Sequence, residues 1–191
     1  MIAVFLATEL ASVRHGPSLR ELLVGQGLRE HILLAPELTN PPESNWRRQL
    51  FDVYRGYGSR VGLFAGFPDD VRWEWVTLTP SELLRVMYIA YDYWVELSGG
   101  SRLAADAPAR IRAGAAPFRV SSEWAIGFGE TFAAGARFPP LIVVSGGPST
   151  RLVVLEGHAR LTAYAMRPDG LPSELDVMLG TSPHMAQWGL Y

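Results

Sequence analysis

The sequence contains no cysteine, so it can form no disulfide, no thiolate metal site and no thiol nucleophile. It also contains no lysine, because all 17 residues counted as Lys+Arg are arginine. A Schiff-base amine and a Walker-type lysine are therefore excluded. Any phosphate would have to be held by arginine, by backbone N–H groups or by a metal ion.

Long hydrophobic runs are missing as well. No stretch approaches the roughly 18 to 20 apolar residues that a membrane-spanning helix needs, and Met1–Thr8 lacks the basic start of a secretory signal. We therefore expect a cytoplasmic protein with no membrane partner. The formal net charge of -2 and the pI of about 6.1 make nucleic acid an unlikely partner, because affinity for a phosphate backbone comes from clustered positive charge.

Size and composition predict one globular domain. A chain of 191 residues that is 48% hydrophobic is long enough for one well-buried core and short for two. We expect a single compact domain over residues 1–191. Within it, residues 1–116 form a mostly helical part of unknown type, packed on a second part that comprises residues 117–191.

Several segments of the first part carry structural signals. The apolar run Met1–Leu6 predicts a buried strand. The segment Pro36–Ser44 contains three prolines and predicts a surface connection, after which Ser44 caps a helix that ends near Gly56. The Ala-, Arg- and Gly-rich segment Ala104–Ala116 predicts an internal linker or lid.

The middle of the chain combines a strand signal with a helix signal. Residues Val71–Val76 alternate in the period-2 pattern of a strand, which places Trp73 and Trp75 on one buried face. The sequence Thr79-Pro80-Ser81-Glu82 has the form of a capping box with proline at the first helical position. It predicts a long helix to Ser98 whose aromatic face is core.

The last third predicts a hairpin followed by a helix. Leu141–Val144 and Leu152–Leu155 are short apolar runs typical of strands, and a Gly- and Ser-rich turn separates them. Gly157 follows, and then a helical pattern runs through Met166. A strand that passes through a glycine into a helix directs backbone N–H groups and the positive end of the helix dipole at whatever lies above the turn.

Three side chains at this turn suit phosphate chemistry. Arg160 would lie in the first helical turn, where its guanidinium could fork onto phosphate oxygens. His158 could donate a hydrogen bond to phosphate or move a proton, and Glu156 could orient either one or hold a metal. The structural alternatives are that Arg160 pairs with Glu156, that His158 faces solvent, and that Glu156 complements the helix N-terminus.

The segments Pro139–Val144 and Leu152–Ala163 resemble the ParB/sulfiredoxin superfamily. Its members share a P-I-x-V strand, a hairpin and an acidic-or-small-Gly-x-x-Arg-x-x-Ala element, and Glu123–Ala134 would be the family's helix before the first of these strands. The resemblance implies an α+β fold in which a small mixed sheet is surrounded by helices. It covers about residues 118–166.

The resemblance also implies a function. In the family this turn binds nucleotide phosphates, so the partners would be a small-molecule substrate and ATP or another nucleotide, with Mg2+. It places nucleotide binding at Gly157, His158, Arg160 and Thr162, metal binding at Glu156, and catalysis at Glu156, His158, and Glu123 or Glu130 as the base. Glu123 and Glu130 have the alternative of being ordinary carboxylates on a helix surface.

Two departures from the family narrow these expectations. Sulfiredoxin activity needs a cysteine in this turn, and the chain has none. Too few residues follow Met166 for the helix-turn-helix domain of a partition protein. A small-molecule phosphotransferase of the kinase type or a nucleotide hydrolase, a ParB-like nuclease and a non-catalytic binding or regulatory module all stay open, as does a homodimer.

Overall fold

The computed structural model describes all 191 residues and has a mixed α+β fold, as the sequence predicts. The chain divides into two compact units, Met1–Phe67 and Pro68–Tyr191. Residues 68–116 thus belong with the second unit, whereas the boundary between the two parts predicted from the sequence lies after residue 116. None of the helices has the length and apolar character needed to cross a membrane.

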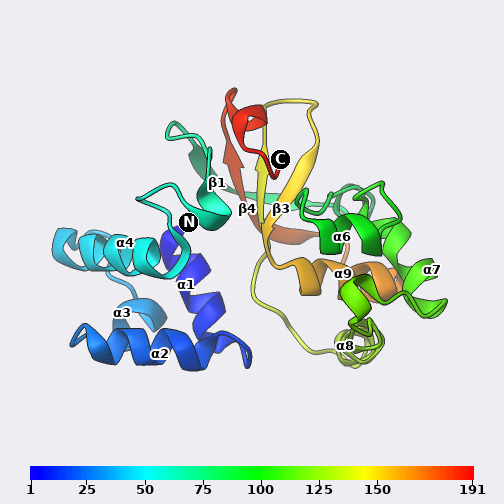
Figure 1. Cartoon of the computed structure of the whole chain (residues 1–191), viewed down its shortest axis with the longest axis horizontal. Helices are drawn as coiled ribbons and strands as arrows, with labels where there is room; N and C mark the ends of the chain where they lie inside the picture. The colour runs from blue at the N-terminus through cyan, green and yellow to red at the C-terminus, as the bar shows by residue number, and fades with distance from the viewer. The chain divides into compact units, whose positions relative to one another are not determined.

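The first unit is entirely helical (Figure 1). Its first element, α1, disproves the predicted strand at Met1–Leu6. A short apolar run fits a strand or a helix equally well, and the buried positions Phe5, Leu6, Glu9 and Leu10 have helical spacing. Phe5 packs against the rings of Phe51 and Phe64. The helices are α1 (Ile2–Ala11), α2 (Gly16–Gly25), α3 (His31–Leu34) and α4 (Pro41–Arg55).

Helix α4 begins earlier than the sequence indicated. Asn40, and not Ser44, is its cap: the Asn40 side chain accepts a hydrogen bond from the backbone N–H of Glu43, and Pro41 takes the first helical position. The predicted surface connection therefore ends at Asn40. Gly56, with a φ of 74°, ends the helix in the left-handed conformation that glycine adopts at least cost, as predicted.

The second unit contains a four-stranded sheet in the order β1-β4-β2-β3. Strands β2 and β3 form the predicted antiparallel hairpin, β4 runs parallel to β2, and β1 pairs antiparallel with β4. The sheet is therefore mixed, and β1 forms one edge. The strands are β1 (Arg72–Leu78), β2 (Ile142–Ser145), β3 (Leu152–Glu156) and β4 (Leu175–Thr181).

Strand β1 lies where its alternation predicted a strand, but the predicted tryptophan core face is wrong. The Trp75 side chain is 55% exposed, and Trp73 is half-buried against Gly180, where an added Cβ would lie 2.6 Å from the indole ring. The buried residue of the strand is Leu78. Alternation in the sequence identifies a strand but does not show whether the strand lies at the edge of the sheet. An edge strand with few neighbours to cover it has the same alternation as a strand with one buried face.

The predicted long helix from Thr79 to Ser98 is broken into two short ones. The capping box forms as predicted, yet α5 covers only Pro80–Leu83 and α6 only Asp92–Leu97. Between them Met87 joins the edge of β3: its N–H donates to the carbonyl of Leu152, and its carbonyl accepts from Val154, both at 2.8 Å. These sheet hydrogen bonds replace the helical ones that local propensity favours.

Three more helices complete the second unit: α7 (Ala107–Arg112), α8 (Trp124–Ala133) and α9 (His158–Met166). The predicted linker Ala104–Ala116 is instead packed structure, since Ala104, Ala107 and Ile111 are buried in the core. Small residues there allow close helix packing, a role that their composition does not distinguish from flexibility. The segment directly before α8, Pro117–Arg119, is a 3₁₀ turn.

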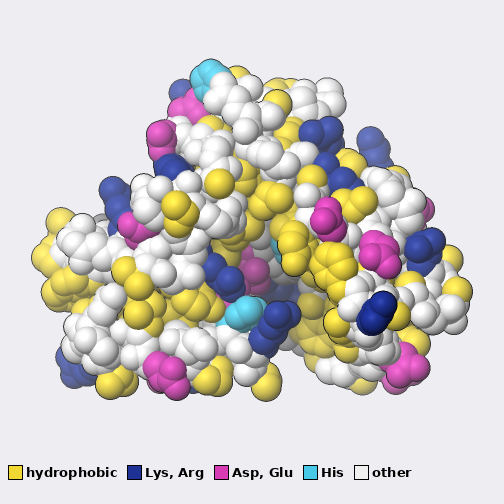
Figure 2. All heavy atoms as spheres, viewed as in Figure 1, with side chains coloured by type: hydrophobic (Ala, Val, Ile, Leu, Met, Phe, Trp, Pro, Cys, Tyr) yellow, Lys and Arg dark blue, Asp and Glu magenta, His cyan; other side chains and the backbone are white.

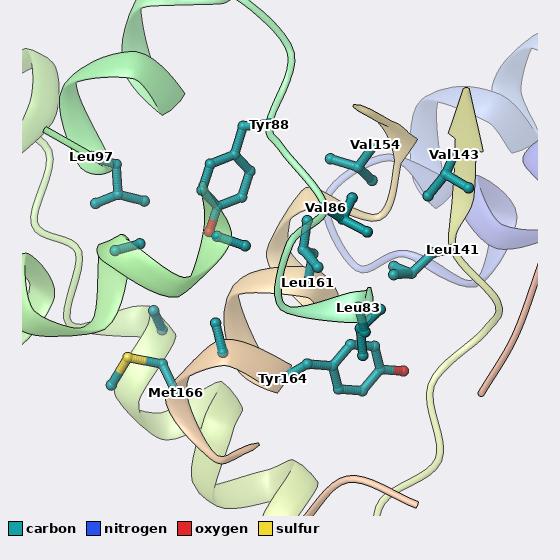
Figure 3. Packing of buried hydrophobic residues seen from close by; sticks show 14 of the residues in the cluster. Leu83, Val86, Tyr88, Leu97, Leu141, Val143, Val154, Leu161, Tyr164 and Met166 are labelled. Atoms are coloured by element: carbon teal, nitrogen blue, oxygen red, sulfur yellow. The ribbon is translucent and has the colours of Figure 1, made fainter. Parts of the chain in front are cut away.

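Helix α9 lies at the centre of the second unit, among α6, α7 and α8 and directly after β3 (Figure 1). Every residue from Arg160 to Met166 is buried. Figure 3 shows Leu161 pointing from α9 towards Val86, with Leu141 and Val143 of the sheet side close by. This packing fixes the start of α9 against the strands, and the predicted site lies at that start.

Candidate functional site

Gly157 forms the junction between β3 and α9, as the sequence predicted. Its φ of 106° and ψ of 24° are left-handed. A Cβ at this position would lie 2.5 Å from Cδ2 of Leu141 and 2.8 Å from Nη2 of Arg160, so no larger residue fits. The carbonyl of Gly157 accepts from the N–H of Leu161 at 2.8 Å, which starts the helix. The N–H groups of the first turn have no partner within the helix.

Arg160 holds this junction together. Its side chain is 5% exposed, and Nη2 donates to Oε1 of Glu156 at 2.7 Å. Nη1 donates to the carbonyls of Pro139 and Pro140 at 2.9 and 3.1 Å. The guanidinium thus connects the end of β3, the first turn of α9 and the segment that enters β2. This is the structural alternative for Arg160. The groups at the turn that remain to bind a ligand are the backbone N–H groups, which have no partner within the helix.

His158, the first residue of α9, is enclosed by aromatic rings. Its imidazole stacks on the indole of Trp94, with 4.9 Å between ring centroids and an angle of 20°, and it lies 6.3 Å from the ring of Tyr88. The residue keeps some exposed surface, but Nε2 is buried and makes no hydrogen bond. Burial, and secondarily the charge of Arg160, lower the pKa of His158 to about 3. The imidazole is therefore neutral at neutral pH and does not simply face solvent.

Thr162 is fully buried beneath the turn. Its hydroxyl donates to the carbonyl of His158 at 2.8 Å and shares a 2.8 Å hydrogen bond with the hydroxyl of Tyr88. Burial raises the pKa of Tyr88, so this phenol stays protonated. Thr162 therefore positions Tyr88 under the stacked imidazole and offers no exposed group for the nucleotide contact that the resemblance implied.

The two candidate bases lie at opposite ends of α8. Glu130 is exposed and follows Gly129, which packs against Met166 at the C-terminal end of α9; its charge acts on Arg167 there. The structure thus does not bring Glu130 to Gly157. Glu123 is exposed just before Trp124, whose indole N–H donates to the hydroxyl of Tyr93 at 3.3 Å. Glu123 therefore lies on the side of the unit where the rings lead to His158.

The residues at the turn provide only part of a shell for Mg2+. Glu156 is the one carboxylate at the junction, and Arg160 occupies its Oε1. No group of three or more His, Asp or Glu side chains converges anywhere in the chain. Because Mg2+ usually takes one or two carboxylates together with substrate phosphates, Glu156 fits a Mg2+ ion that arrives with a nucleotide.

A cluster of rings beside this turn was not expected from the sequence, and we call it the aromatic shelf. Tyr91, Phe118 and Trp124 are exposed, and Tyr93, which contacts Phe118 and Trp124, is half-buried. Tyr93 lies edge-on to Trp94 at 4.9 Å between centroids, so the shelf continues from the rings around His158. Phe118 lies 6.2 Å from Tyr91 and 6.1 Å from Tyr93. Helical periodicity had assigned Tyr91 to a core face, and no signal in the sequence linked the two tyrosines to Phe118.

The first unit contains a second polar cluster that the sequence did not reveal. Glu9 is 3% exposed; its Oε1 pairs with Nη2 of Arg55 at 2.6 Å, and its Oε2 accepts from the hydroxyl of Tyr54 at 2.7 Å. His15 approaches the same carboxylate, with Nδ1 at 3.6 Å. Burial lowers the pKa of His15 although the charge of Glu9 opposes this. These contacts neutralise a buried carboxylate and tie α1 to α4.

The chain matches no protein-family model, and no similar curated protein or solved structure was found. The candidate site is therefore supported by its geometry alone.

Proposed function

We propose that the chain is a nucleotide-binding protein of the ParB/sulfiredoxin-like type and that it receives nucleotide phosphates at the turn between β3 and α9. The observation that carries the proposal is His158: its Nε2 is buried without a hydrogen bond, at the first position of a helix whose N–H groups are unpaired within the helix. A buried polar atom without a partner is costly, and a rotation of the imidazole towards an anion above the turn would give Nε2 the missing acceptor.

The junction supports this role because it is rigid. Arg160 fixes the turn through three acceptors, and Gly157 lets the backbone approach closely without a side chain. Donors that are already oriented bind an anion with little reorganisation. In this proposal the backbone N–H groups and the imidazole contact the phosphate, and Arg160 positions them.

Small-molecule phosphotransfer is the reaction we propose for the bound nucleotide. Phosphoryl transfer depends mostly on positioning and electrostatics, and Glu156 lies at the turn with one oxygen held by Arg160. Its carboxylate would take the proton of an acceptor hydroxyl while the terminal phosphoryl group moves to that oxygen and leaves a nucleoside diphosphate. A non-catalytic binding module is the second candidate, and the position of Glu130 at the far end of α9 favours it.

A thermal-shift screen against ATP, ADP, CTP and GTP, with and without Mg2+, tests the proposal because a ligand of the folded state raises apparent stability. We expect at least one nucleotide to raise the Tm. His158→Phe keeps a ring on Trp94 and removes both nitrogens, so it should weaken binding by about tenfold, the scale of one hydrogen bond to a charged group. His184→Phe, at an exposed histidine, is the matched control. No shift with any nucleotide would refute the proposal.

A further inference from the structure

The aromatic shelf exposes rings that a core would bury. Phe118 is 54% exposed and Tyr91 is 51% exposed, and the two meet nearly edge-to-face at 81°. Figure 2 shows hydrophobic side chains at the surface over α6, next to acidic ones. Isolated exposed apolar residues are common on proteins, but several aromatic rings in contact with one another indicate a binding surface.

The backbone that presents Phe118 is strained. Phe118 and Arg119 have φ values of 53° and 62°, so two successive residues with side chains occupy the left-handed region. Each such residue costs on the order of 1 kcal/mol, and such strain is concentrated at ligand clamps and active sites. The side chain of Arg119 is exposed and makes no hydrogen bond or ion pair. The strained turn therefore projects an aromatic ring and a free positive charge from the same place.

Continuous ring contacts connect the shelf with the candidate phosphate site. From His158 the contacts run to Trp94 at 4.9 Å, from Trp94 to Tyr93 at 4.9 Å, and from Tyr93 to Phe118 at 6.1 Å. Three short steps thus separate the first residue of α9 from the exposed ring of Phe118. A ligand with an anionic end and a flat aromatic end matches this arrangement of a donor turn, a wall of rings and a nearby guanidinium.

We propose that the aromatic shelf stacks the base of a nucleotide whose phosphates lie at the turn between β3 and α9, and that it favours purines. The inference rests on the proposed function, because it assumes that the phosphates of the nucleotide bind at this turn. Base stacking on aromatic side chains is worth about 1 to 3 kcal/mol per base, and a purine offers the larger flat surface to Phe118 and Tyr91. Arg119 contributes a cation next to the stacked base or its sugar-phosphate.

Calorimetric titration of the full chain with ATP, CTP, adenosine and inorganic tripolyphosphate separates binding of the base from binding of the phosphates. We expect ATP to bind about tenfold more tightly than tripolyphosphate, and CTP to fall between them. Phe118→Ala and Tyr91→Ala should each abolish most of the ATP advantage and leave the affinity for tripolyphosphate unchanged. Trp75→Ala, which removes an equally exposed ring from strand β1, should change neither affinity.

The outcomes distinguish the two proposals. Equal affinity of the wild type for ATP and tripolyphosphate would refute base stacking on the aromatic shelf and leave the proposed phosphate site unaffected. A higher affinity for ATP that persists in both shelf variants would have the same consequence. Binding of adenosine that depends on Phe118, without any binding of tripolyphosphate, would support the shelf and refute the proposed function. If no ligand binds, both proposals fail. Circular dichroism of each variant confirms that a loss of binding is not a loss of folding.

Discussion

At the residue scale, the candidate site depends on Arg160 and His158, which differ in charge and in how their polar atoms are paired. Arg160 carries a charge that is fully used within the protein, by Glu156 and two proline carbonyls. His158 is neutral and retains a buried nitrogen without a partner. The guanidinium therefore holds the turn in place, and the imidazole and the backbone N–H groups are the donors that the proposed function assigns to an anion.

Arg160→Lys should destabilise the protein. A lysine keeps the positive charge but cannot bridge Glu156 and two carbonyls at once, because its donors radiate from a single nitrogen. We expect the free energy of unfolding to fall by roughly 1 to 3 kcal/mol, the scale of lost hydrogen bonds to a charged group. Urea unfolding measures this. An unchanged midpoint would show that the contacts of Arg160 contribute nothing to stability.

His158 should make stability depend on pH. Its folded-state pKa is about 3, whereas an unfolded histidine titrates near ~6.5. Between these values the unfolded chain binds a proton that the folded chain does not, so the free energy of unfolding falls as the pH falls from about 6.5 towards about 3. His158→Phe should remove up to about 1.4 kcal/mol per pH unit of this slope.

Urea unfolding at several pH values within this window checks the expectation, with His31→Phe as the control at another exposed histidine. The result that would contradict it is the same pH dependence in the wild type and in His158→Phe. That outcome would mean that the imidazole is protonated in the folded state without a penalty.

Local signals in the sequence predicted elements well where no distant partner intervened. The capping box at Thr79 and the terminator Gly56 form as expected, and so does the order of β2, hairpin, β3, Gly157 and α9. The long helix after Thr79 failed because Met87 pairs with β3, a strand more than sixty residues later. No local pattern encodes that pairing.

The candidate site shows the same limit. The sequence placed Glu156, Gly157, His158 and Arg160 together because they are neighbours in the chain. It could not show that Arg160 turns inward to Pro139, or that Trp94 covers His158. Both contacts depend on how α9 packs within its unit. The aromatic shelf was missed for the same reason, since its rings come from three separate segments.

The strained turn at Phe118 leads to a prediction at the scale of the element. Arg119→Gly should relieve one left-handed residue and raise the free energy of unfolding by up to about 1 kcal/mol. Arg137→Gly is the matched control, because Arg137 is also exposed but has no positive φ, so glycine there should cost stability through the unfolded chain. Urea unfolding compares the two. A loss of stability in both variants would show that the φ of Arg119 stores no strain.

At the scale of the whole molecule, the chemistry proposed for this chain lies in the second unit. That unit has its own hydrophobic core around α9, and the turn, the rings and the shelf all belong to it. The first unit contains the buried Glu9 cluster, whose contacts hold α1 against α4 within that unit. The proposed function therefore requires that an anion binds at residues 157–160.

The most direct test is a titration of the full-length protein, labelled with nitrogen-15, with ATP and with tripolyphosphate, followed by NMR. The account predicts saturable shifts of the backbone amides of Gly157, His158 and Ala159 and of the imidazole nitrogens of His158, while the amides around Asp70 and His184, a hydrogen-bonded pair elsewhere in the same unit, stay in place. Saturable shifts at Asp70 and His184 with none at residues 157–159, or no shifts at all, would contradict it.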